Sequence, residues 1–177
     1  MTAGALIVLA LRLAIPVSIL RWPVAGGIAS MVIDGIDVVL ITLMDLGGFG
    51  GHYHSLDKLL DTYYLSIEWF IALRWENPWA RWTSAVLLPY RIIGVVLFEF
   101  TDRRIMLFIF PNLFENWWLY CAIAIGHLPR IAPRSARSAA LILLLLLVPK
   151  MGQEYLLHYA EAQPWDWTKR HILRGAI

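Results

Sequence analysis

Long apolar runs separated by short polar turns make up most of this chain. Each run is long enough to approach the ~20 apolar residues that an α-helix needs to cross a lipid bilayer. A membrane β-barrel would instead need short segments in which apolar and polar residues alternate. The sequence therefore predicts an all-α, polytopic membrane protein, a single domain built as a bundle of about six transmembrane helices. The expected spans are residues 6–20, 24–44, 56–75, 83–100, 105–126 and 139–160.

Composition agrees with this prediction. Hydrophobic residues make up 59% of the chain and charged residues 16%, whereas soluble domains average about 25% charged residues. The nine Trp residues fit membrane interfaces, and the Trp-rich, basic tail 161–177 suits a segment lying on headgroups. We expect an integral, multi-pass protein whose partner is membrane lipid. The net charge of +2 gives no reason to expect nucleic acid, and neither the membrane nor the orientation follows from the sequence.

Two acidic pairs carry the main functional signal. Asp34 and Asp37 lie inside the second apolar run, and Asp57 and Asp61 open the third. Spacings of three and four place each pair on one helix face, and the short glycine-rich linker 45–55 would let the two faces meet. A carboxylate in lipid costs roughly 2.5–3.5 kcal/mol, so such residues usually have a function. Four converging carboxylates would suit a hard divalent cation, Mg²⁺ or Mn²⁺.

The same residues resemble a known family signature. The segments D34-G-I-D37 and L56-D57-K-L-L-D61 are similar to the first and last parts of D-x2-D-G-x2-A-R-x8-9-G-x3-D-x3-D, the signature of the CDP-alcohol phosphotransferases. The resemblance implies a six-span membrane enzyme that binds divalent metal and displaces CMP from a CDP-linked lipid or alcohol. In that family's scheme Asp34, Asp37 and Asp57 would hold the metal, and Asp61 would be the general base.

The resemblance covers roughly residues 6–61. Arg12 and Pro16 resemble the arginine and proline often found in the family's first membrane helix. Val38 and Tyr53 stand where the signature has glycine, and its Ala-Arg pair is absent. The positions that differ are those that contact the nucleotide in the family. The resemblance therefore implies a metal-dependent transferase scaffold and leaves CDP recognition open.

Histidine and glutamate supply further candidate ligands. His52 and His54 form an H-x-H pair that could bind metal together with Asp57, admit protons, or simply lie at the interface. Glu154, His158 and Glu161 share one helix face near the end of the sixth run, where side chains that extend to the interface are the simpler interpretation.

Other charged residues extend the set of candidates. Asp57, Asp61, Tyr64 and Glu68 form one stripe on the third span, which predicts either a seam between helices or a functional cavity. Arg91 in the fourth span would pair with a charge on another helix or contact substrate. The loop after the fifth span would bind an anionic headgroup or a substrate phosphate, or would only set orientation; its arginines are Arg130, Arg134 and Arg137.

These patterns support one functional hypothesis and leave two alternatives. The first is an integral membrane enzyme acting on a lipid or lipid-linked phosphate or diphosphate with a divalent metal. The second is a non-catalytic membrane subunit or scaffold, assembled as a homodimer or with other membrane proteins. The third is a small ion-coupled transporter that uses Asp34, Asp37 and Glu68.

Overall fold

The computed structural model describes residues 3–43, 53–103 and 105–155. Within these ranges every regular element is helical, which confirms the all-α prediction. The elements are α1 (Ala3–Ala14), the 3₁₀ helix η1 (Ile15–Leu20), α2 (Pro23–Leu43), α3 (Tyr53–Ala72), α4 (Pro78–Thr101), α5 (Ile105–Ile109), α6 (Leu113–Gly126) and α7 (Ala136–Glu154).

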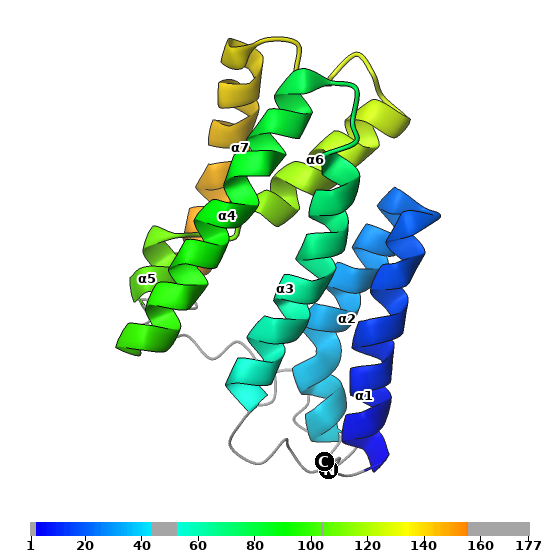
Figure 1. Cartoon of the computed structure of the whole chain (residues 1–177), viewed down its shortest axis with the longest axis vertical. Helices are drawn as coiled ribbons and strands as arrows, with labels where there is room; N and C mark the ends of the chain where they lie inside the picture. The colour runs from blue at the N-terminus through cyan, green and yellow to red at the C-terminus, as the bar shows by residue number, and fades with distance from the viewer. Residues whose placement is uncertain (1–2, 44–52, 104, 156–177) are drawn as a thin grey trace, which may run out of the picture.

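The helices run up and down along the long axis of the molecule (Figure 1). α1, α2 and α3 lie together on one side, α4, α5 and α7 lie on the other, and α6 crosses obliquely between them. We call the end with the α3–α4 turn and the α6–α7 loop the upper end. The lower end holds the start of α1, the end of α2 and the start of α3.

Local sequence signals explain where the helices begin and end. Proline has no N–H and is tolerated in the first turn of a helix, and Pro23 and Pro78 occupy that position in α2 and α4. Asn77 caps α4 by accepting a hydrogen bond from the N–H of Ala80 at 3.0 Å. Ser135 and Ser138 form a reciprocal capping box at the start of α7, which satisfies donors that the helix leaves open.

The expected fifth span is broken in the structure. α5 ends at Ile109 and α6 begins at Leu113, because Pro111 cannot donate a helical hydrogen bond and disfavours helix in the residue before it. The carbonyls at the break have partners on α4. The hydroxyl of Tyr90 donates to Ile109 O at 2.7 Å, and Arg91 Nη1 donates to Phe110 O at 2.9 Å. Such partners are what a backbone break needs inside a bilayer.

Two helices of the described residues are long and apolar enough to cross a membrane, namely α4 and the segment Ala136–Gln153 of α7. Leu6–Leu20 and Pro23–Ile36 are shorter apolar helices. The expectation of six spans is therefore met only in part.

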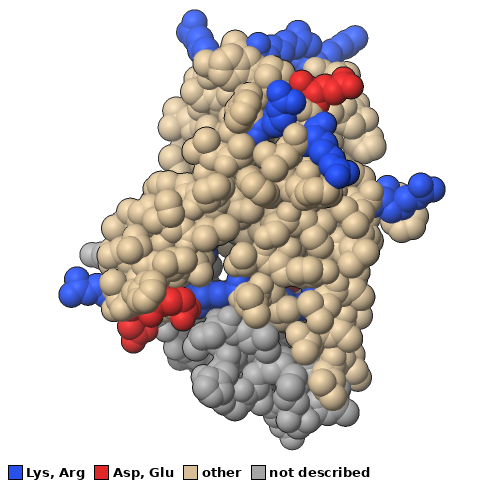
Figure 2. Space-filling view, in the orientation of Figure 1, with Lys and Arg blue, Asp and Glu red and all other residues tan. Residues whose placement is uncertain are grey.

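The surface gives a second reason to expect contact with lipid. Phe100, Leu145 and Val148 are 85%, 73% and 68% exposed. A large exposed apolar surface marks contact with a membrane or another protein. On the face shown in Figure 2, charged side chains gather toward the upper and lower ends and leave an uncharged belt between them.

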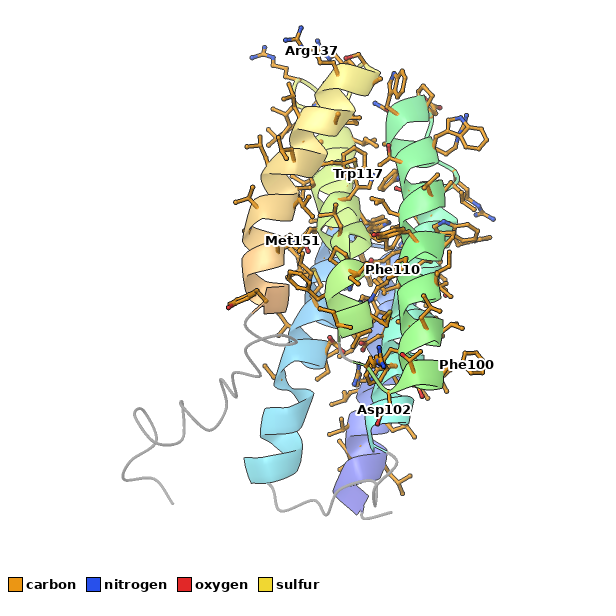
Figure 3. The ribbon with its side chains drawn as sticks, turned by 90° about the vertical axis from the view of Figure 1, so that its left-hand side faces the viewer. Phe100, Asp102, Phe110, Trp117, Arg137 and Met151 are labelled. Atoms are coloured by element: carbon orange, nitrogen blue, oxygen red, sulfur yellow. The ribbon has the colours of Figure 1, made fainter. Side chains whose placement is uncertain are left out.

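The core of the bundle is built around α6. Phe114, Trp117 and Trp118 are each 0% exposed. Figure 3 shows Trp117 on the inner side of the helices, with Arg137 at the upper end and Asp102 at the lower end. The indole N–H of Trp118 donates to the backbone carbonyl of Glu68 on α3 at 2.7 Å. These aromatic side chains fix the distance between α3, α4 and α6, on which the geometry of the site depends.

Candidate functional site

A buried arginine joins the first three helices. Arg12 of α1 is 3% exposed, and one of its nitrogens, Nη2, donates to Oδ1 of both Asp34 and Asp61. The contact with Asp61 is 2.5 Å long. Asp34 comes from α2 and Asp61 from α3, so one guanidinium bridges carboxylates from two different helices. We call these three residues the Arg12 cluster.

The cluster follows from the packing of α1, η1, α2 and α3. Pro16 and Ile19 in η1 are buried, and η1 packs against both α2 and α3. Gly26 allows the backbone of α2 to approach η1, since a Cβ at that position would lie 2.5 Å from the backbone nitrogen of Ile19. Arg12 lies one turn before Pro16 and is thereby directed to the acidic faces of α2 and α3.

The three residues of the Arg12 cluster do not by themselves make a site for a divalent cation. Aspartates of α2 and α3 do converge, but the guanidinium of Arg12 already contacts Oδ1 of both carboxylates. Among the described residues no group of three or more His, Cys, Asp or Glu lies close enough to hold a metal. The side chains of Asp37, His54 and Asp57, and all of His52, lie outside the described residues, so the predicted four-aspartate site is not tested.

Asp61 also faces a narrow cleft between α3 and α4. The polar side chains that line it with Asp61 are Lys58 and Thr62 of α3, Arg91 of α4 and Asn112 at the start of α6. The cleft has a volume of about 20 Å³, which is space for roughly one water molecule. Lys58 also lies over the ring of Phe98, with its Nζ 4.5 Å from the ring centroid. The cleft that Asp61 lines therefore also contains two cationic side chains, a hydroxyl group and an amide group.

A second polar group continues from the cleft into the core. Asn112 Nδ2 donates to Glu115 Oε2 at 3.0 Å, and the hydroxyl of Tyr64 donates to Glu115 Oε1 at 2.6 Å. One turn above Tyr64, the side chain of Glu68 is 0% exposed. The polar stripe expected on the third span therefore lies inside the bundle at Tyr64 and Glu68.

The basic loop lies away from this site. Arg130, Arg134 and Arg137 are exposed. The first two belong to the α6–α7 loop, and Arg137 lies in the first turn of α7 at the upper end (Figure 3). The end of α2 and the start of α3 lie at the opposite end. The structure therefore does not bring these three arginines close to Asp61. They could not bind the same substrate phosphate that Asp61 would contact. Arg91 is the predicted cation that does reach Asp61's cleft.

Several site residues were not predicted from the sequence. Lys58 precedes Asp61 by three residues and Thr62 by four, spacings on one helix face that could have identified Lys58 from the sequence. Asn112 reaches the cleft only because the helix breaks at Pro111. The tail 161–177 lies outside the described residues, and so do the side chains of the predicted Glu154, His158 and Glu161 row.

Comparison with known proteins identifies no relative of this chain. No family model matches the chain, and no curated protein or solved structure matches it either.

Proposed function

We propose that this chain is an integral membrane enzyme that acts on a lipid or lipid-linked phosphate or diphosphate. The observation that carries the proposal is the position of Asp61. Its carboxylate belongs to the Arg12 cluster on one side and lines the cleft with Lys58 and Arg91 on the other. A carboxylate held in place beside cationic groups is an arrangement that can accept a proton from a hydroxyl while a phosphate binds next to it.

The proposed roles follow from chemistry and position. Lys58 and Arg91 bind the phosphate, and Thr62 and Asn112 orient it through hydrogen bonds. Asp61 is the general base that takes the proton of the acceptor hydroxyl. Arg12 holds Asp61 and Asp34 in place. The cleft must widen for a phosphate to enter, because its volume of about 20 Å³ suits a single water.

The divalent cation is a separate part of the proposal. We propose Mg²⁺ or Mn²⁺ as the cofactor, with Asp34, Asp37 and Asp57 as its ligands. The role of the metal would be to neutralise charge on the transferred group. The proposal also takes the chain to be multi-pass, with α1 and η1, α2, α3, α4, α5 with α6, and α7 as six crossings.

The proposal is tested by assaying CMP release from CDP-diacylglycerol in detergent micelles, with a panel of small alcohols as acceptors and with Mg²⁺, Mn²⁺ or chelator. We expect metal-dependent release that Asp61→Asn lowers by about 10²-fold or more, the usual contribution of a general base. Glu99→Gln is the matched control, because Glu99 is an exposed acid on α4 outside the cleft. A CDP-linked substrate is excluded if no acceptor supports CMP release, and the proposed role of Asp61 fails if Asp61→Asn and Glu99→Gln have equal activity.

A further inference from the structure

Glu68 is a fully buried acid without a hydrogen-bond partner. It lies in the middle of α3 with 0% exposure. Within the described chain, neither of its carboxyl oxygens receives a hydrogen bond. The indole of Trp118 donates to the backbone carbonyl of Glu68 and not to its carboxyl group. On the α2 side, Oε1 would lie 3.4 Å from a Cβ built on Gly27, so the carboxyl group is enclosed by helix backbone and an aromatic ring.

An ionised carboxylate in these surroundings would be very costly. An unpaired buried charge costs several kcal/mol, whereas a neutral acid avoids most of that cost. The identifiable neighbours of Glu68 come from three helices. α2 presents Gly27, α3 itself presents Tyr64, and α6 presents Trp118 and a second acid, Glu115.

Glu115 has the opposite kind of environment. Its two oxygens accept hydrogen bonds from Tyr64 at 2.6 Å and from Asn112 at 3.0 Å. Of these two acids, Glu68 is therefore the one whose carboxyl group lacks hydrogen-bond donors among the described residues. Asn112 also lines the cleft beside Asp61.

We propose that Glu68 is a proton-binding site, which holds a proton as a neutral carboxylic acid in the core of the bundle. When the pH is raised far enough, the O–H bond of Glu68 breaks and hydroxide takes the proton, so that Glu68 gains the negative charge. The inference does not depend on the proposed enzyme function.

Infrared spectroscopy of the purified full-length protein tests this directly. A protonated carboxyl group has a carbonyl stretch that ionised carboxylates lack, and a carboxyl without hydrogen bonds absorbs at the high-frequency end of that range. We expect such a band at neutral pH in the wild type and its loss in Glu68→Gln. Glu76→Gln, which changes an exposed acid in the α3–α4 turn, should keep the band. Raising the pH should remove the band from the wild type reversibly.

Glu115→Gln provides a second measurement that does not need Glu68 to be changed. Removing the neighbouring negative charge should let Glu68 ionise more readily, so the band should disappear at a lower pH than in the wild type. The proposal is overturned if the wild type has no band at neutral pH, if the band survives in Glu68→Gln, or if Glu115→Gln leaves its pH dependence unchanged. Loss of the band on adding Na⁺ at constant pH would also overturn it, in favour of a metal cation at Glu68.

Discussion

At the scale of single residues, Arg12 shows how the bundle tolerates acids among its apolar helices. A cation and two anions together have a formal net charge of −1, so the guanidinium of Arg12 compensates the charge of one of the two carboxylates. The arrangement is stable only as a set, because removing one partner leaves the others buried without compensation. Arg12 is nearly inaccessible, while the side chains of Asp34 and Asp61 are 28% and 32% exposed. Because both carboxylates contact this one guanidinium, loss of the arginine removes an ion pair from each of them at once.

We predict that Arg12→Met destabilises the protein by about 3 kcal/mol, the lower end of the range for breaking a buried ion pair. The loss arises because Asp34 and Asp61 are left facing each other with no cation between them. Unfolding in mixed detergent micelles, followed by circular dichroism, measures the change. Adding Asp34→Asn and Asp61→Asn to Arg12→Met should restore much of the stability, because the uncompensated charges are then gone. Equal stability of the wild type and Arg12→Met would contradict the bridging role.

At the scale of elements, glycines set how closely the helices approach. A Cβ on Gly26 would lie 2.5 Å from the backbone of Ile19, one on Gly27 would lie 2.5 Å from the ring of Trp118, and one on Gly94 would lie 2.2 Å from Phe110. These three contacts hold α2 against η1 and α6, and α4 against the end of α5. Close backbone approach through small residues is a usual way for membrane helices to associate.

We predict that Gly26→Ala destabilises the protein by at least the 1–3 kcal/mol that is typical of an overpacked core. The added methyl group would meet backbone atoms of η1, which cannot move aside as a flexible side chain can. Gly35→Ala on the same helix is the matched control, because a Cβ there meets nothing within 4 Å. That control should be neutral or more stable by about 0.5–1 kcal/mol. The same unfolding assay compares the two variants, and equal effects would contradict the packing of α2 on η1.

At the scale of the whole molecule, the sequence predicts where the helices lie along the chain better than it predicts which side chains meet between helices. Runs of apolar residues and prolines set the elements to within a few residues, because those signals are local. The convergence of α2 and α3 is visible from Asp34 and Asp61, yet their bridging partner Arg12 is far away in sequence. Likewise, Asn112 enters the cleft through the break at Pro111. Contacts of this kind depend on how α1 and α4 pack against α3, which no local pattern encodes.

The arrangement of the helices predicts on which side of the membrane each connection between them lies. The α3–α4 turn and the α6–α7 loop lie at the upper end, and the α4–α5 corner lies at the lower end. If α4 crosses the bilayer, the α3–α4 turn and the α4–α5 corner lie on opposite sides of it. If α5 and α6 together make the next crossing, the α6–α7 loop returns to the side of the α3–α4 turn. Exposed residues mark all three places, namely Glu76, Arg103 and Arg137.

We predict that an impermeant maleimide applied to sealed vesicles of one orientation distinguishes these sites. Glu76→Cys and Arg137→Cys should react from the same side, and Arg103→Cys should react only from the other side or after detergent is added. The wild type is the control, because its single cysteine, Cys121, is 0% exposed and should not react in either case. Reaction of Arg103→Cys from the same side as the other two would mean that α4 does not cross. The six crossings proposed above would then be wrong, because α4 is one of them.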